Sequence, residues 1–497
     1  MHLTHNPIPE VMIMKRFFAV VLCCIMSITS PIVSHAADAA YEGTAVVYDN
    51  RYESYAAIQS LKDMVDLDYF KTFIMNGTSV CSTSIDISSF NIRYSSENMA
   101  LLSQFIYNEI PENFHLNSRI SYSYKFGKIT KVNPTYSYDV SEYQRMLSEM
   151  EEAKENLLRG IKDNASLGEV EKALLIHDRL ALLCEYDYTG TDNRYNSYGA
   201  LVSGIAVCQG YTEAYDYLLE EVGIESYFCS SDKLNHAWNI VYINNIPYHV
   251  DVTWDDPSWE VGEDGVIGAV RHENFLRSTS GIYSSGHEAD DFDSFPDDTT
   301  YDNYFWQNSE ASFRLINNEL YYIDNDSEEL KRYSDGTVLC SVSYEWRDEY
   351  GYWSNNARLS DNGTDLLFSS ANAIYRFDLV MNAKTKIYEP SLSGYNSIYG
   401  FDYSDGYLIC DINKAPPYSG NTENVFRISA LYHPVLYGDV NGNGTVGLSD
   451  ATVLMQYISD WDVSINTEAA DINRDGRITL RDITLLLRYI AGWDVIC

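Results

Sequence analysis

Basic residues are scarce in this sequence. Its 497 residues include 34 lysines and arginines but 72 aspartates and glutamates, which gives a formal net charge of −38 at pH 7. Binding to phosphate groups needs a basic surface, so nucleic acids and anionic membranes are poor candidates as partners. A chain of this length is also too long for one ordinary hydrophobic core, and we expect several domains.

Long apolar segments are absent beyond the N-terminus, which argues against a membrane-spanning helix. Near the N-terminus, Lys15 and Arg16 precede the apolar run FFAVVLCCIMSI, which is too short for a stable anchor. A small-x-small cleavage pattern follows at Ser34 to Ala36. We therefore predict a signal peptide over residues 1–36 and a secreted, extracellular mature protein.

Cysteine is sparse as well, with nine residues in the whole chain. Cys23 and Cys24 lie in the predicted signal peptide, and the other seven are scattered, which excludes a disulfide scaffold. Because seven is odd, at least one exported thiol should lack a disulfide partner. The seven are Cys81, Cys184, Cys208, Cys229, Cys340, Cys410 and Cys497.

Cys208 is predicted to lie where a loop meets a helix. The small apolar stretch SGIAV precedes it, and apolar residues then recur every three or four positions from Tyr211 to Val222, until Gly223 ends the pattern. The free N–H groups at the start of a helix favour a thiolate. Most buried cysteines are nevertheless only small hydrophobic residues, and this local pattern leaves both interpretations open.

Downstream of Cys208, the stretch HAWNIVYINNIPYHVD predicts a β-hairpin with a two-residue turn at residues 244–245. If Ile243 pairs with Ile246 and the pairing continues outward, His236 and Asp251 become diagonal neighbours on one face of the sheet. An imidazole beside a carboxylate is the arrangement of an oriented general base.

The stretches around these three residues resemble the bacterial secreted branch of the transglutaminase-like superfamily. They are EKALLIHDRLALLCEYDY, NSYGALVSGIAVCQGYTEAYDYLLEEVGI and HAWNIVYINNIPYHVDVTWDDP. The resemblance implies a papain-like α+β core with Cys208 as nucleophile, His236 as base and Asp251 as the residue that orients the base. It also implies action on peptide or glutamine amides through a thioester on Cys208. The N–H of Cys208 is the default donor to an oxyanion, and Gln209 is a further candidate.

Three outcomes stay open for this thiol. Hydrolysis in the manner of a cysteine peptidase is favoured, because water is abundant outside the cell and an amine must be bound to compete with it. Protein–glutamine transamidation, or cross-linking, is the alternative within the same chemistry. A non-catalytic binding component is the alternative outside it. His177 and His249 are expected to be structural residues.

The catalytic region should comprise two parts, an N-terminal α+β leader over residues 37–165 and the transglutaminase-like core over residues 166–299. The apolar periodicity predicts helices over residues 141–158 and 166–184. Ser166 and Glu169, three residues apart, have the spacing of a capping box at the start of the second helix.

Residues 300–432 have a different texture. Three similar patches each combine a strand, a polar turn, an apolar strand, a second turn and a strand in which Tyr or Phe stands beside Arg. Their apolar centres at Tyr321, Leu367 and Leu408 have the spacing of four-stranded blades. We predict a β-rich repeat module with propeller-like blades, although three blades are too few to close a ring.

Two copies of one motif end the sequence. GDVNGNGTVGLSDATVLMQYISDWDV and ADINRDGRITLRDITLLLRYIAGWDV align without a gap, 32 residues apart (471 − 439 = 32 for the first aspartates). In each copy, oxygen-bearing side chains occupy loop positions 1, 3, 5 and 12, glycine occupies position 6, and position 7 offers its carbonyl, as in a calcium loop. The predicted ligands of two structural Ca²⁺ ions are Asp439, Asn441, Asn443, Thr445, Asp450, Asp471, Asn473, Asp475, Arg477 and Asp482.

These EF-hand-like loops depart from ordinary EF-hands, because position 12 is aspartate and no entering helix is expected before the first loop. An exiting helix is expected with one apolar face formed by Leu448, Ala451, Leu454, Met455 and Ile458. The pattern resembles the type I dockerin over residues 433–497. That resemblance implies docking to a cohesin module of a scaffoldin in a cellulosome. A role in polysaccharide catabolism would follow only from association with the other proteins of a cellulosome and is not favoured.

Overall fold

The computed structural model describes residues 42–48, 60–257, 266–287, 295–344, 357–392, 396–413 and 426–491. It divides into two compact units, one formed by residues 1–265 and 269–312 and the other by residues 266–268 and 313–497. The predicted signal peptide and Cys497 lie outside the described residues. Within the described ranges, we find no helix whose length and apolar character would let it cross a bilayer.

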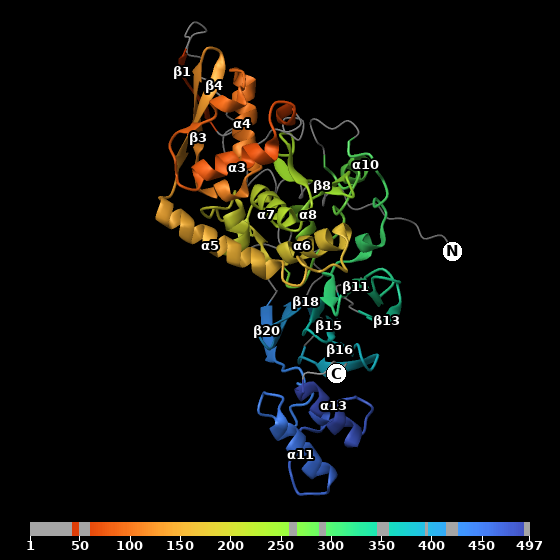
Figure 1. Cartoon of the computed structure of the whole chain (residues 1–497). Helices are drawn as coiled ribbons and strands as arrows, with labels where there is room; N and C mark the ends of the chain where they lie inside the picture. The colour runs from red at the N-terminus through yellow and green to blue at the C-terminus, as the bar shows by residue number, and fades with distance from the viewer. Residues whose placement is uncertain are drawn as a thin grey trace, which may run out of the picture. The chain divides into compact units, whose positions relative to one another are not determined.

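The first unit begins with an antiparallel sheet of order β1-β3-β4-β2 (Figure 1). Its strands are β1 (Glu42–Tyr48), β2 (Ile85–Asp86), β3 (Leu116–Lys125) and β4 (Lys128–Tyr136). Helices α3 (Leu67–Thr78) and α4 (Ser96–Asn108) share one apolar core with this sheet. Short 3₁₀ turns, η1 (Ser88–Phe90) and η2 (Pro111–His115), connect these elements. This part of the chain therefore combines helices with an antiparallel sheet, and its role as the leader of a catalytic region stays a prediction.

Two long helices follow, α5 (Val140–Leu157) and α6 (Glu169–Leu183), close to the predicted ranges. The predicted capping box at the start of α6 is wrong. Ser166 bonds to Asn164 instead, Gly168 occupies the N-cap position without a side-chain bond, and the Glu169 carboxylate accepts the N–H of Asn244. A local hydrogen bond of Ser166 thus competes successfully with capping.

The centre of the first unit is helix α7 (Cys208–Glu221), which packs against α6 and a three-stranded antiparallel sheet (Figure 1). The sheet consists of β7 (Ser226–Ser231), β8 (His236–Ile243) and β9 (Ile246–Val250). Side chains on all sides of α7 are buried, from Cys208 to Leu219. The remaining elements are β5 (Glu185–Tyr186), a π-helical turn η3 (Gly199–Ser203), β6 (Ile205–Ala206), α8 (Val252–Asp255), α10 (Thr279–Ser284) and η4 (Phe305–Asn308).

The second unit contains a β-rich module of three antiparallel sheets, one for each predicted repeat. The first comprises β10 (Arg314–Ile316), β11 (Glu319–Asp324), β12 (Glu329–Arg332) and β13 (Val338–Ser341). The second comprises β14 (Leu359–Asp361), β15 (Leu366–Ser369), β16 (Ile374–Asp378) and β17 (Ala383–Tyr388). The third comprises β18 (Ser397–Ser404), β19 (Tyr407–Asn413) and β20 (Phe426–Leu431). The β-rich repeats are confirmed, whereas their propeller-like arrangement stays a prediction.

The duplicated motif at the C-terminus forms α11 (Leu448–Ile458), the short α12 (Thr467–Ala470) and α13 (Leu480–Ile490). As predicted, residues 432–438 before the first loop are not helical. The predicted apolar face of α11 needs one correction. Ala451 and Leu454 are buried, but Leu448 and Met455 are exposed, with 67% and 44% of their surfaces accessible. Helical periodicity identifies a row of apolar residues but not whether the chain itself covers them.

Candidate thiol site and calcium loops

Cys208 is the first residue of α7, as the sequence predicts. Val207 in front of it is extended and offers no capping side chain, so the thiol lies beside helix N–H groups that lack intrahelical partners. The Cys208 side chain is 6% exposed and packs with Phe228 and Ala237 of the neighbouring sheet. The thiol therefore lies at the positive end of the helix dipole and beside His236, the first residue of β8.

His236 begins β8 and is paired with Ser231 of β7, which fixes its backbone. Its Nε2 donates to Asp251 Oδ2 over 2.6 Å, and Cys208 lies close enough to influence its pKa. Burial alone would lower the pKa of His236, but the charge and hydrogen bond of Asp251, aided by Cys208, raise it to about 10. The imidazole is therefore protonated at neutral pH.

Asp251 lies just beyond the end of β9, where the chain turns into α8. Its Oδ1 accepts the N–H groups of Thr253 (3.0 Å) and Trp254 (3.2 Å), so the carboxylate caps this short helix. Although burial opposes ionisation, the charge of His236 holds the pKa of Asp251 well below its usual range. A buried carboxylate is thus kept ionised by its hydrogen bonds and by a cationic neighbour.

The hairpin register is confirmed, with Ile243 opposite Ile246 and both turn residues at positive φ. The prediction that this register extends to Asp251 is wrong, because the β8–β9 pairing ends at Val250. The His236–Asp251 contact nevertheless forms, since helix capping brings the carboxylate back toward the sheet. The contact was predicted, but the backbone that produces it was not.

Two aromatic side chains that the sequence did not single out complete the surroundings. His287 Nε2 lies 2.7 Å from Asp251 Oδ2, the same oxygen that His236 contacts. The Trp254 ring packs on both imidazoles, with centroids 5.2 Å from His236 and 4.0 Å from His287. Trp254 stands in the quoted TWDDP stretch, whereas no motif surrounds His287.

Gln209, the candidate oxyanion donor, is directed elsewhere. Its Nε2 donates to Glu213 Oε1 one turn along α7, over 2.9 Å, and its Oε1 is buried without a hydrogen-bond partner. One of the two N–H groups of the amide is therefore used inside the helix. The backbone N–H of Cys208 remains the candidate donor of a hydrogen bond to the oxyanion.

A second group of buried histidines and carboxylates lies on α6, on α8 and in the segment that follows α8. His177 bridges Asp178 (2.9 Å) and Asp255 (3.2 Å), while His272 bonds Asp178 (3.0 Å) and the carbonyl of Ser309 (3.0 Å). Three of these side chains, those of His177, Asp178 and His272, have the proximity of metal ligands. Each imidazole nitrogen already has a partner, so the group is a structural network that links α6 to the segment after α8. His177 is a structural residue in this network. His249 likewise contacts Trp238 and Thr279.

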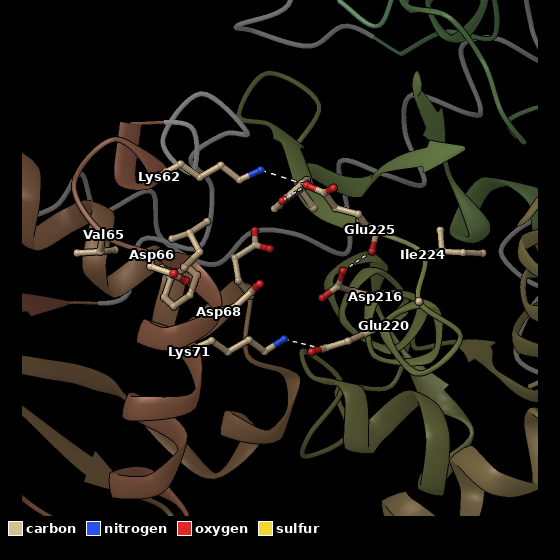
Figure 2. A pocket seen from close by; sticks show the side chains of 15 residues that line it. Lys62, Val65, Asp66, Asp68, Lys71, Asp216, Glu220, Ile224 and Glu225 are labelled. Carbon is tan, nitrogen blue, oxygen red and sulfur yellow. Dashed lines mark hydrogen bonds and ion pairs between the residues drawn. The ribbon is translucent and has the colours of Figure 1, made fainter. Parts of the chain in front are cut away.

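Figure 2 shows a cavity of the first unit, about 650 Å³, at the opposite end of α7 from Cys208. Lys62 and Lys71 reach across it to Glu225 (3.1 Å) and Glu220 (2.6 Å). Asp216 forms part of its wall and bonds to Ser226, and burial raises the pKa of this carboxyl to about 7. Eight residues of helix separate Asp216 from Cys208, about 12 Å along the axis. Cys208, His236 and Asp251 are not among the residues that line this cavity.

The two predicted calcium loops have the same internal geometry. In the first, Asp439 accepts the N–H groups of Asn443 and Gly444, and Asp450 accepts those of Asn441 and Gly447. In the second, Asp471 accepts the N–H groups of Asp475 and Gly476, and Asp482 accepts those of Asn473 and Thr479. Glycine at position 6 has positive φ in both loops. The carboxylates and amide oxygens gathered in this way are the hard ligands that Ca²⁺ prefers, so the donor set fits the ion.

Residues 437–491 match the family of the dockerin type I domain. The crystal structure of a type I cohesin–dockerin complex from Clostridium thermocellum, with OlpA cohesin and Doc918, is 36% identical over 12% of this chain and 100% of that chain, with a TM-score of 0.12. The C-terminal part of the chain therefore belongs to the type I dockerin family, a family whose members typically bind calcium.

Two solved structures are similar to other parts of the chain. A TGase is 14% identical over 33% of this chain and 48% of its own, with a TM-score of 0.20. A putative cysteine protease from Cytophaga hutchinsonii is 18% identical over 28% of this chain and 55% of its own, with a TM-score of 0.18. This chain thus spans about half the length of each. A search of curated proteins finds no match. Because both TM-scores are low, our interpretation of the thiol site depends on its geometry.

The raised histidine pKa values predict how stability changes with pH. The pKa values of His177 (about 9) and His236 (about 10) exceed that of an unfolded histidine, about 6.5. The resulting stabilisation is complete below pH 6.5 and is lost as the pH rises through 9 to 10. We therefore expect thermal denaturation to show a lower melting temperature at pH 10 than at pH 6.5.

The variant His177→Gln should lose part of this pH dependence. The matched control is His249→Gln, because burial lowers the pKa of His249 to about 3 and this residue is neutral throughout the range. A melting temperature that rises from pH 7 to 10 in the unaltered protein would contradict the prediction.

Proposed function

We propose that this chain is a secreted thiol enzyme that attacks peptide or glutamine amides with Cys208 and passes the acyl group to water, as a cysteine peptidase does. The observation that supports it is the alignment of three groups, a thiol at a helix N-terminus, an imidazole in contact with it, and a buried carboxylate on the imidazole. A purely structural cysteine has no need of this set.

In the proposed reaction the Cys208 thiolate attacks the amide carbonyl carbon, and the oxyanion accepts the N–H of Cys208. His236, protonated because of Asp251, gives its proton to the leaving amine, and a thioester remains on Cys208. The now neutral His236 then takes a proton from water, which attacks the thioester and releases the acid. Asp251 keeps the imidazole oriented through both steps.

The acceptor of the acyl group decides between hydrolysis and cross-linking. Both reactions proceed through the same thioester, and free amines compete with water only where the protein binds them or excludes water. Of the seven cysteines after the predicted signal peptide, the six that the structure describes form no disulfide. Cys208 is therefore not held in a disulfide and is available as a nucleophile.

The dockerin supplies the proposed location. Helices α11 and α13 expose apolar side chains at equivalent positions, 32 residues apart. A soluble monomer rarely exposes such a group of apolar side chains unless another protein covers it. The matched pairs are Leu448 with Leu480, Met455 with Leu487, and Tyr457 with Tyr489. We infer that this face binds a cohesin module outside the cell, with Ca²⁺ at both loops holding the helices in place.

For the β-rich module we infer a propeller-like arrangement from its regularly spaced sheets.

Calcium dependence tests the docking. Replacement of Asp439 and Asp471 together by alanine removes the first ligand of each loop, so the module should lose its fold and cohesin binding should fall by at least about 100-fold. Binding is measured by calorimetry with a type I cohesin in calcium and in chelator. Asp462→Ala, an exposed aspartate between the loops, is the control and should bind normally. Unchanged binding by the double variant would refute calcium-dependent docking.

The amide chemistry is tested with a glutamine-containing protein substrate and a labelled primary amine. We expect peptide fragments without amine incorporation from the unaltered protein, and no fragments from Cys208→Ser. Cys81→Ser, which alters a partly exposed thiol outside the site, serves as the control and should retain activity. Efficient amine incorporation without cleavage would instead establish transamidation, and neither product at any enzyme concentration would favour the non-catalytic alternative.

A further inference from the structure

Asp251 has a second imidazole partner that the proposed mechanism does not use. Its Oδ2 contacts His236 at 2.6 Å and His287 at 2.7 Å, while its Oδ1 accepts two backbone N–H groups. The carboxylate thus has four hydrogen-bond contacts, two at each oxygen. Both imidazoles and the carboxylate are buried, and His287 itself has no accessible surface. This geometry leaves Asp251 with no freedom to rotate toward solvent.

The surroundings of His287 define its charge. Burial lowers its pKa, although the carboxylates of Asp251 and Asp255 oppose that effect and the charge of His236 adds to it. Burial is also the largest cause of the lowered pKa of His249, another buried imidazole. A neutral imidazole carries one N–H, and a carboxylate is only an acceptor, so His287 places that hydrogen on Nε2. Its Nδ1 lies 3.2 Å from Ser285 Oγ.

We propose that His287 is a positioning residue of the thiol site, where it donates Nε2–H to Asp251 Oδ2 and holds the carboxylate in the orientation that His236 needs. This inference rests on the proposed function, because it concerns the same triad. His287 does not contact Cys208 in this account and acts only through Asp251. It differs from His236 in being neutral, so it fixes the carboxylate without cancelling its charge.

The Trp254 ring explains why this second donor matters. It lies against both imidazoles, on the same short helix that Asp251 caps. Loss of His287 would leave a space beside Trp254 and an unpaired lone pair on Asp251 Oδ2. The ring and the carboxylate could then shift together, and a displacement of about 1 Å in such a site costs on the order of 100-fold in rate.

The experiment measures the rate of Cys208 alkylation by iodoacetamide against pH in the full-length protein, with mass spectrometry identifying the modified cysteine. In His287→Ala, we expect the rate at pH 6 to fall about tenfold and the midpoint of the profile to move about one unit higher, because His236 stabilises the thiolate less well. His287→Gln keeps an N–H near the position of Nε2 and should restore most of the rate and the original midpoint.

His249→Gln is the matched control, a buried histidine near the site that bonds Trp238 and Thr279 rather than Asp251. It should lower the melting temperature without moving the midpoint. A His287→Ala profile that coincides with the unaltered one, or that moves to lower pH, would overturn the proposal, as would failure of His287→Gln to restore it. Since alkylation needs no substrate, these outcomes stay distinct from a failure to cleave amides.

Discussion

The buried charge of Asp251 is the constraint on which the thiol site depends. It lies where β9 ends and α8 begins, and its four hydrogen-bond contacts join strand, helix and two imidazoles. An ionised carboxylate is costly inside a protein unless such contacts compensate it. Asp251 therefore has two effects at once. It holds the backbone turn closed, and it keeps His236 protonated beside Cys208.

The buried histidines of the first unit show that the environment, rather than burial itself, decides their charge. Burial acts to lower the pKa of four of them, His177, His236, His249 and His287. Direct contact with carboxylates outweighs burial at His177 and His236, whose pKa values rise to about 9 and about 10. At His249 and His287 the pKa falls, because burial is the largest effect at both and His287 shares its carboxylate with the cationic imidazole of His236. One residue type thus provides a cation for the thiol and a neutral donor for the carboxylate.

Much of this site was predictable from the sequence, because its members lie at the ends of strongly periodic elements. The apolar pattern placed Cys208 at a helix start, and the Asn-Asn turn set the hairpin register that positions His236. His287 could not be predicted, since it approaches Asp251 through tertiary packing 36 residues along the chain. Ser166 failed as a cap because local bonds competed. In the dockerin, the loop ligands followed from their spacing, whereas the exposure of Leu448 required the structure.

The central claim is that the Asp251–His236 pair makes Cys208 the reactive thiol of the chain. Burial raises the pKa of other thiols, including Cys81, and raises that of Cys340 to about 11. The direct test is competitive labelling of the native protein at pH 6 with a limiting amount of iodoacetamide, followed by mass spectrometry of every cysteine peptide. The account predicts that Cys208 is labelled first although it is buried. Faster labelling of the more exposed Cys81 or Cys340 would contradict it.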